Sequence, residues 1–350
     1  MSTGRERKSF VLLLTCLAIV LLSLGTFAAA QGPAVADFPS FMPFVGVEKT
    51  GDVAVDKIGN IYVNLTIGGT DQIWRIPLIG EPSMVAELGT GTAFGLALDA
   101  NGDIYAAVTG QDRGVYRVDN KGISMLLPGT DQIIAANAMA FDSRGYLYVT
   151  ESSSEAPGAQ GGIWRVSRKE PAKLMLRHDL LTGIGATPLG ANGIGYYHGN
   201  LYVVNSNKHL IVRIPILPDG SLGEPEVWKE IEEVAESLLA GTPFPLMGDG
   251  LALDVHGNIY VAMVTRLAVV RINAEDRSQE TIAAFGFDPD APLFAPLDFP
   301  NALAFGTGKG GRQIMFVTNL GVTNMYIPGP PWPGRGIMKI EVGIPGLPLP

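Results

Sequence analysis

The sequence predicts an all-β protein, a six-bladed β-propeller with four strands in each blade. Two observations predict it: a strand–turn–strand pattern recurs six times, and a second short strand pattern follows each copy. Repeats of this length that contain several short strands are typical of propeller blades. The repeats are 43 to 57 residues apart and start at Gly51, Phe94, Asn137, Asn192, Asp249 and Asn301.

The N-terminal segment predicts export. Arg5, Arg7 and Lys8 precede an apolar run over 10–24, and small residues follow it up to Ala30. This order is typical of a secretory signal peptide, so we assign 1–30 to the signal and 31–350 to a single propeller domain. The only cysteine, Cys16, lies in the signal. We expect a secreted or extracytoplasmic protein, although an uncleaved segment of this length could also anchor it to a membrane.

Each repeat opens with the inner strand of a blade, rich in glycine and alanine because little space is available near the propeller axis. A tight turn of the pattern Asp-x-x-Gly follows in four repeats, and a second strand comes after it. The aspartate of such a turn bonds its own backbone, and the glycine takes a positive φ. We therefore interpret these turn aspartates as structural: Asp56, Asp99, Asp142 and Asp254.

The third strand of each blade carries one basic residue, as in Ile73-Trp74-Arg75-Ile76, and we expect these cations to be solvated. The last repeat ends in a proline-rich segment that cannot pair as a fourth strand. The segment 44–48, ahead of the first repeat, has the pattern of such a strand. We therefore expect an N-terminal strand to close the last blade.

Composition excludes some partners. The net charge is -9 and no basic cluster is present, so we expect no nucleic-acid partner and no membrane partner beyond the signal segment. A small-molecule ligand such as a lactone, bound by a monomer, fits better.

The longest predicted loops leave one face of the propeller, where binding residues are usually found. In one of these loops Val227, Ile231, Val234 and Leu238 have helical spacing, which predicts a short covering helix. The first residues of the inner strands should converge at the channel mouth on this face.

Four of these first residues are Asn137, Asn192, Asp249 and Asn301. Amide and carboxylate oxygens suit Ca²⁺ or a similar divalent cation, with Zn²⁺ or Mn²⁺ as alternatives. The simpler interpretation is that these side chains bond the backbone where a loop enters a strand. Three residues that follow second strands, Glu151, Asn205 and Asn319, could support the same site and contact substrate, or could be ordinary loop residues.

Two of these motifs resemble the gluconolactonase family, which includes regucalcin and the luciferin-regenerating enzyme. Asn192-Gly193-Ile194 is similar to its metal-binding Asn-Gly motif, and Asp249-Gly250-Leu251 to its Asp-Gly-Leu motif. The resemblance implies that Asn192 and Asp249 bind the metal, that Asp249 also acts as acid or base, and that Asn137 contacts substrate. Asn301, at the equivalent place in the last repeat, is our third candidate metal ligand. The family's first-blade glutamate would fall at Gly51, and the nearby Glu48 and Asp52 are out of register.

Two functions stay open. The first is a metal-dependent hydrolase of small cyclic esters such as sugar lactones. The second is a non-catalytic secreted binding or scaffold propeller of the NHL type. The Asn and Asp residues favour the first, and Gly51 favours the second.

Overall fold

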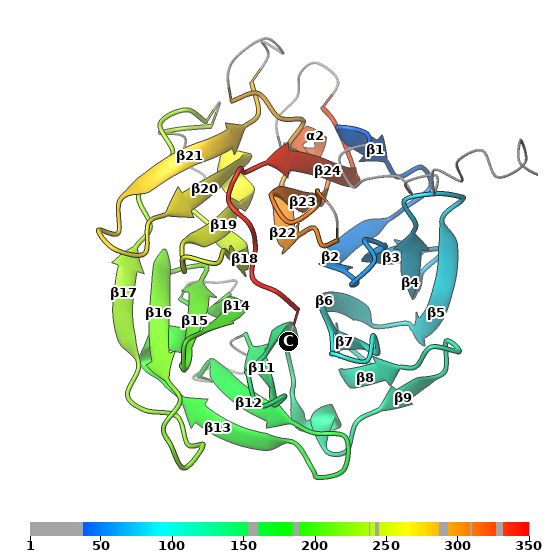
Figure 1. The fold of residues 1–350 in the computed structure, drawn as a ribbon, viewed down its shortest axis with the longest axis vertical. Coiled ribbons are helices and arrows are strands. Elements are labelled where there is room, and N and C mark those ends of the chain that lie inside the picture. The colour runs from blue at the N-terminus through cyan, green and yellow to red at the C-terminus, as the bar shows by residue number, and fades with distance from the viewer. Residues whose placement is uncertain are drawn as a thin grey trace, which may run out of the picture. The chain divides into compact units, whose positions relative to one another are not determined.

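Six antiparallel four-stranded sheets form the fold, and Figure 1 shows them as blades arranged in a ring. This confirms the predicted six-bladed, all-β architecture. The computed structural model describes residues 38–152, 160–184, 189–237, 239–241, 245–286, 293–308, 310–326 and 332–349. The predicted signal peptide, 1–30, lies outside these residues. Among the described residues no helix is long and apolar enough to cross a membrane.

Blades 1 to 5 each use four strands that are consecutive in sequence. Blade 1 contains β2 (Lys49–Val55), β3 (Ile61–Ile67), β4 (Thr70–Ile76) and β5 (Ser83–Gly89). Blade 2 contains β6 (Thr92–Leu98), β7 (Ile104–Thr109), β8 (Gly114–Val118) and β9 (Ser124–Leu126). Blade 3 contains β10 (Ala136–Phe141), β11 (Leu147–Glu151), β12 (Gly162–Val166) and β13 (Lys173–Arg177). Blade 4 contains β14 (Ala191–Tyr197), β15 (Asn200–Asn205), β16 (Leu210–Pro215) and β17 (Glu226–Glu230). Blade 5 contains β18 (Gly248–Leu253), β19 (Ile259–Met263), β20 (Ala268–Ile272) and β21 (Gln279–Ala284).

Blade 6 joins the two ends of the domain. Its order is β1-β24-β23-β22, with β22 (Pro300–Phe305), β23 (Ile314–Asn319), β24 (Gly336–Glu341) and β1 (Phe41–Pro43). The N-terminal strand therefore closes the last blade, as predicted. The expected segment 44–48 was wrong, because the pairing lies three residues earlier, with Met42 opposite Ile337. Glu48 already belongs to blade 1, where its backbone N–H donates to the Thr66 carbonyl at 2.8 Å.

Helical segments are few and short in the described chain: η2 (Thr130–Gln132), η3 (Asp179–Leu181), η4 (Val264–Arg266) and α2 (Thr323–Tyr326). The helix predicted over 227–238 was wrong. Val227 lies in β17, which pairs with β16, and Ile231 and Val234 pack into the core from irregular backbone. Because Val227 is already paired with Val212 in the sheet, a helix cannot begin at this residue.

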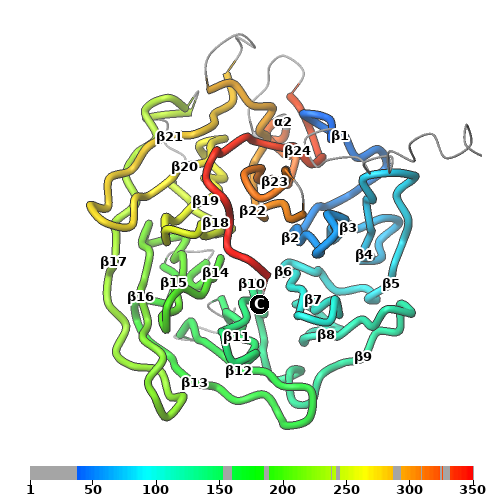
Figure 2. Tube along the Cα trace, viewed as in Figure 1, coloured from blue at the N-terminus to red at the C-terminus, as the bar shows by residue number. Residues whose placement is uncertain are grey.

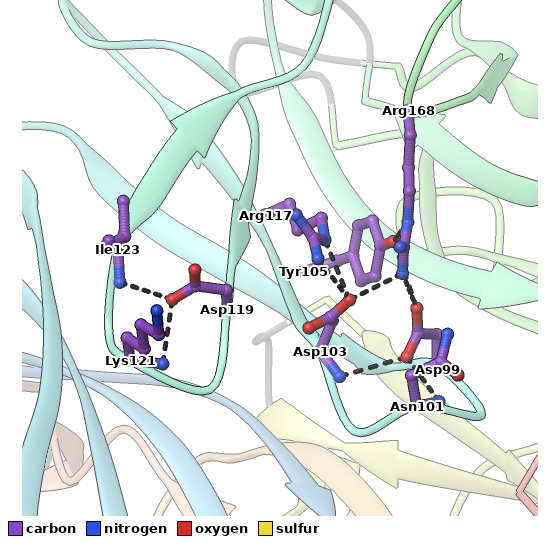
Figure 3. A network of polar contacts seen from close by, with 9 residues as sticks. All are labelled: Asp99, Asn101, Asp103, Tyr105, Arg117, Asp119, Lys121, Ile123 and Arg168. Atoms are coloured by element: carbon purple, nitrogen blue, oxygen red, sulfur yellow. Dashed lines mark hydrogen bonds and ion pairs between the residues drawn. The ribbon is translucent and has the colours of Figure 1, made fainter.

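The turns between the first and second strands confirm the structural interpretation of their aspartates. Asp99 Oδ1 accepts hydrogen bonds from the backbone N–H groups of Asn101 at 2.8 Å and Asp103 at 3.1 Å (Figure 3). Gly102 adopts φ +83°, as such a turn requires. The other three predicted turn aspartates bond their own turns in the same way.

The basic residues of the third strands are not simply solvated, which corrects that expectation. In five blades an arginine lies directly opposite a tyrosine of the second strand, as Arg117 lies opposite Tyr105. Arg117 also pairs with Asp103 at 2.7 Å, and Arg168 of the next blade reaches the same carboxylate at 2.7 Å (Figure 3). Arg213 and Arg271 likewise pair with Glu226 and Glu280 of the fourth strands, whereas Arg75 is exposed, as predicted.

A bulge interrupts the pairing of every inner strand near its start. The register with the second strand shifts between Thr50 and Val53 in blade 1, and between Gly248 and Leu251 in blade 5, with equivalent shifts in the other blades. A bulge bends a strand and redirects its side chains. The first residues of the repeats all lie at these bulges.

The C-terminal segment 342–349 crosses one end of the channel. Figure 2 shows it running inward from β24 past β18 to the middle of the ring. Leu347 N–H donates to the Leu253 carbonyl at 3.2 Å, and Val255 N–H donates to the Pro345 carbonyl at 3.0 Å. These contacts lie at the end of β18, whereas Asp249 lies at its beginning. The tail therefore covers the end of the channel away from the predicted site.

Candidate functional site

The candidate site lies where the inner strands of blades 4, 5, 6 and 1 begin. Asn192, Asp249 and Asn301 occupy three of these positions, as the sequence predicted. Blade 1 adds Asp52, whose nearness to these residues was not predicted from the sequence. Four consecutive blades thus bring two carboxyls and two amides to one side of the ring.

Asn192 and Asp249 lie beside each other. The Asn192 Nδ2 donates to Ser206 Oγ at 3.0 Å, and a hydrogen bond from the same side chain holds the pKa of Asp249 down against stronger opposing effects. The backbones also touch, since a Cβ added at Gly193 would lie 2.4 Å from the Asp249 carbonyl oxygen. Glycine is therefore required at this position for the two strands to approach.

Burial and, to a smaller extent, the negative charge of Asp52 together raise the pKa of Asp249 to about 7. Desolvation disfavours the charged form of a carboxyl, and a nearby like charge has the same effect. Blade 6 separates the blades that carry these two residues, so an interaction between them means that both side chains project toward the channel. Each is partly accessible there, while protein surrounds it on its other sides.

Asp52 lies in the bulge of β2 with Gly51. Burial also raises its pKa to about 7, although hydrogen bonds from the backbone N–H groups of Leu96 at 2.9 Å and Val53 at 2.7 Å act in the opposite direction. These bonds fix the carboxyl between blades 1 and 2. In the sequence, the only indication that Asp52 belongs to the site is its position next to Gly51, the first residue of the repeat.

Gly51 cannot be replaced by a residue with a side chain without a local rearrangement. A Cβ at this position would lie 2.4 Å from the Ala93 carbonyl oxygen and 2.9 Å from Asn64 Cβ. The glutamate that the resemblance led us to expect therefore does not fit at Gly51. Asp52, one residue later, supplies a carboxylate from the same bulge.

Asn301 links the two carboxyl-bearing blades. Its Nδ2 donates to the Gly51 carbonyl at 2.8 Å, and its backbone carbonyl lies against Gly250. Its Oδ1 is buried and has no hydrogen-bond partner in the part of the chain that the structure describes. An unpaired buried acceptor is costly unless a ligand, an ion or water satisfies it.

The donor set fits a divalent cation that prefers oxygen. Two carboxylates and two amide oxygens are the ligand types of Ca²⁺. Among the described residues, no group of three or more His, Cys, Asp or Glu side chains is placed so that it could hold a metal ion by itself. A cation at this site would therefore depend on the asparagines as well as on Asp52 and Asp249.

Asn137 lies at the start of β10 in blade 3, next to the blade of Asn192. Its Nδ2 donates to Ser152 Oγ at 3.1 Å, and Ser152 in turn donates to the Ala191 carbonyl at 2.7 Å. This repeats the Asn192–Ser206 arrangement one blade earlier. Contact of Asn137 with substrate stays a prediction.

Three other predicted residues brace the long loops. Glu151 is 1% exposed and accepts hydrogen bonds from Trp164 Nε1 at 2.8 Å, Arg177 Nη2 at 2.7 Å and the Ile134 N–H at 3.0 Å. Asn205 and Asn319 are fully buried, and their Nδ2 atoms donate to backbone carbonyls of the preceding connections, at 2.8 Å in each case. The structure brings none of the three into contact with Asp249, and their contact with substrate stays a prediction.

Comparison with known proteins agrees with the fold. Residues 123–295 match the family model described as the SMP-30/gluconolactonase/LRE-like region. A luciferin-regenerating enzyme superposes with a TM-score of 0.63 at 14% identity, over 89% of this chain and 98% of that chain. A calcium-binding protein, regucalcin from Agrobacterium tumefaciens, superposes with a TM-score of 0.62 at 15% identity, over 89% of this chain and 97% of that chain. No curated protein matches the sequence.

The fold is a six-bladed propeller, and residues 123–295 are similar to the SMP-30/gluconolactonase/LRE-like region. The resemblance to the gluconolactonase, regucalcin and luciferin-regenerating enzyme family is thereby confirmed. The matched region contains the Asn192-Gly193-Ile194 and Asp249-Gly250-Leu251 motifs that carried the resemblance, while Asp52 and Asn301 lie outside it.

Proposed function

We propose that this protein hydrolyses small cyclic esters with the help of a divalent cation, and that Asp52, Asn192, Asp249 and Asn301 hold that cation at the channel. The observation that carries the proposal is the approach of two carboxyls, Asp52 and Asp249, from blades on either side of Asn301. Held together, these negative charges are unfavourable, and a divalent cation would offset both.

Calcium is the cation that we propose. The four side chains offer only oxygen, and they come from separate blades with the irregular spacing that calcium tolerates. Zinc favours nitrogen and sulfur ligands. When bound, the cation would polarise the ester carbonyl and acidify water.

Asp249 is our proposed proton-transfer residue. Hydrolysis adds water to the carbonyl carbon and breaks the ring C–O bond, so one proton must leave the water and one must reach the ring oxygen. A carboxyl with a pKa near neutral can accept the first and return the second. Burial and the Asp52 charge give Asp249 this property. Asn192 orients the Asp249 carboxyl through their hydrogen bond.

We further propose that the mature protein acts outside the cytoplasm as a monomer on a small-molecule substrate. The signal-like segment 1–30 supports the location, and the acidic net charge of the full chain, -9, argues against a nucleic-acid partner. Fractionation of cells that express the full chain, followed by size-exclusion chromatography, tests both points. A cytoplasmic location or a stable dimer would contradict them.

The test of the function combines binding with turnover. Chelator-treated protein is titrated with Ca²⁺ by calorimetry, and hydrolysis of γ-butyrolactone and D-glucono-δ-lactone is followed by acid release. Wild type should bind one Ca²⁺ and hydrolyse at least one lactone only when it is loaded. Asp52→Asn and Asp249→Asn should each weaken calcium binding at least tenfold and reduce turnover, with Asp249→Asn the more damaging.

The matched control is Asp131→Asn, an exposed residue of the short helix η2 between β9 and β10. It removes the same charge without touching the channel and should match wild type. Calcium binding without any lactone turnover would favour the binding or scaffold propeller instead. No calcium binding by wild type would refute the proposed site.

A further inference from the structure

One row of side chains repeats across blades 1 to 5: a small residue on the first strand, a tyrosine on the second and an arginine on the third. In blade 3 the row is Ala140, Tyr148, Arg165 and Lys173, which lie opposite one another from β10 to β13. The residue of the fourth strand differs between the blades, which carry, in order, Ser83, Met125, Lys173, Glu226 and Glu280. Among these five, blade 3 alone places a second cation opposite its arginine.

The residue of the fourth strand decides whether the arginine is neutralised within the row. In blade 4, Arg213 pairs with Glu226 at 2.7 Å, and blade 5 has the equivalent pair. In blade 3, Arg165 and Lys173 are like charges directly opposite each other, which destabilises a pair of strands. Within the described residues neither of these two cations forms an ion pair.

A third cation, Arg144 of the turn after β10, lies beside Arg165. The guanidinium carbons of Arg144 and Arg165 are 5.3 Å and 4.7 Å from the centre of the Tyr146 ring. Both guanidinium groups also reach Gly220 of blade 4, where an added Cβ would lie 3.4 Å from Arg165 Nη1 and 3.7 Å from both terminal nitrogens of Arg144. The fold therefore holds two guanidinium groups within a few ångströms of one point between blades 3 and 4.

Solvent reaches these side chains. The Arg144 side chain is 41% exposed and Tyr146 is 40% exposed. Lys173 is also exposed, and Arg165 is partly exposed. A solute can thus contact the three cations without a rearrangement of the chain.

The junction between blades 2 and 3 shows how the same place is neutralised elsewhere. Arg117 and Arg168 meet two carboxylates there, Asp99 and Asp103, and Arg168 pairs with both (Figure 3). The charges of this network cancel. In the turn of blade 3, Tyr146 takes the place of Asp103, so the corresponding network one blade later lacks one carboxylate.

The carboxylates near the blade 3 cations do not compensate them. Asp142 is the one acid of the described chain that pairs with any of the three, with Arg144 Nε at 3.3 Å. Asp219 precedes Gly220 in sequence, but hydrogen bonds from Ser221 of its own turn lower its pKa and occupy its carboxylate. Three cations against one carboxylate leave an excess of two positive charges.

We propose that Arg144, Arg165 and Lys173 form a binding site for a divalent tetrahedral oxyanion, either a free phosphate or sulfate ion or the phosphate group of a monoester. Guanidinium groups donate hydrogen bonds in pairs to such oxygens, and the lysine ammonium adds a further donor. A divalent anion matches the excess charge, whereas a carboxylate would offset half of it. This site is independent of the proposed function, because Arg144 follows the end of β10 and the proposed calcium ligands lie at the beginnings of inner strands.

The binding test titrates calcium-free protein with sodium sulfate and sodium phosphate by calorimetry, in chloride buffer at pH 8, where both anions are divalent. Wild type should bind one anion. Lys173→Glu recreates the arrangement of blades 4 and 5 and should weaken binding at least about tenfold, since it removes a donor and adds a repulsive charge. Lys121→Glu makes the same change of charge at an exposed lysine between β8 and β9 and is the matched control, which should bind as wild type does.

A stability measurement separates this site from a purely structural role of the cations. Lys173→Glu replaces a repulsive pair with an attractive one, so in chloride it should melt at or above the temperature of wild type. Sulfate also stabilises folded proteins non-specifically, and the rise of melting temperature with sulfate is therefore compared between variants. The rise should be larger for wild type and Lys121→Glu than for Lys173→Glu.

Glucose 6-phosphate distinguishes the two sources of the anion. Tighter binding of this ester than of inorganic phosphate would assign the site to a phosphate group of a larger molecule, and equal or weaker binding would assign it to the free ion. If none of the three anions binds to wild type, or if Lys173→Glu binds them as tightly as wild type, the inference is overturned. None of these measurements depends on lactone turnover, so failure of the proposed function would leave this result standing.

Discussion

Replacing Asp249 with asparagine should have opposite effects on stability without and with calcium. The change keeps the size of the side chain and removes its charge. In the calcium-free protein it relieves the desolvation of Asp249 and its repulsion of Asp52. In the calcium-loaded protein it removes one of two anionic ligands. The free energy of unfolding should therefore rise in the first state and fall in the second.

The size of the first effect follows from the pKa of Asp249, which burial raises from 3.8 to about 7. Each pKa unit corresponds to about 1.36 kcal/mol, so the raised pKa corresponds to a destabilisation of at most about 4 kcal/mol by the charged form of Asp249. Asp249 borders the channel, and water entering there reduces the effect, so we expect about 1–2 kcal/mol. With calcium at a hundred times its dissociation constant, wild type should gain about 2.7 kcal/mol.

The stability difference between Asp249→Asn and wild type depends on pH. Between about pH 4 and 7 the folded protein binds more protons at Asp52 and Asp249 than the unfolded chain does, so their contribution to stability declines as pH rises through this window. Below pH 4 a protonated Asp249 resembles asparagine. The stability difference between Asp249→Asn and wild type should thus be small at pH 4 and reach its full value above pH 7.

Urea unfolding followed by tryptophan fluorescence measures this difference at pH 4.5, 6 and 8, with chelator and with calcium. Asp131→Asn serves as the control and should follow wild type throughout. The reasoning would be refuted by an Asp249→Asn variant that is less stable than wild type at pH 8 in chelator. Stability that calcium leaves unchanged in wild type would refute it equally.

Three further predictions concern the scaffold. Gly51→Ala should destabilise the protein by about 1–3 kcal/mol in urea unfolding, because the new methyl overlaps the Ala93 carbonyl oxygen; wild-type stability would show that the bulge can rearrange. Deleting the chain up to Pro43 removes β1 and exposes the edge of β24, so the truncated protein should melt at a lower temperature and aggregate; an unchanged melting temperature would contradict closure by β1. Removing 343–350 should lower the free energy of unfolding by about 1–2 kcal/mol, because hydrogen bonds at the end of β18 are lost. Calcium affinity, measured by calorimetry, should not change, since Asp249 lies at the other end of that strand.

The repeating pattern of the sequence was enough to determine the fold. Six copies of a small-residue strand, each followed by a turn or short connection and a second strand, leave few architectures, and turns such as Asp99–Gly102 are local structures that four residues specify by themselves. The closing strand was also predictable in kind, since the last blade lacked one strand. Its position at 41–43 was not, because two neighbouring segments have similar alternation and only pairing with β24 selects between them.

Part of the candidate site could be predicted from the sequence. Asn192 and Asp249 occupy equivalent places in neighbouring blades, and propeller symmetry brings such places together. Asp52 was judged out of register because a sequence shows no bulge, and the bulge of β2 decides where its carboxyl points. The surroundings of Glu151, Asn205 and Asn319 were equally hidden, since several of their bonding partners lie 17 to 26 residues away in other segments. Local chemistry thus determined strands and turns, whereas side-chain direction and burial depended on contacts between segments that only the closed ring brings together.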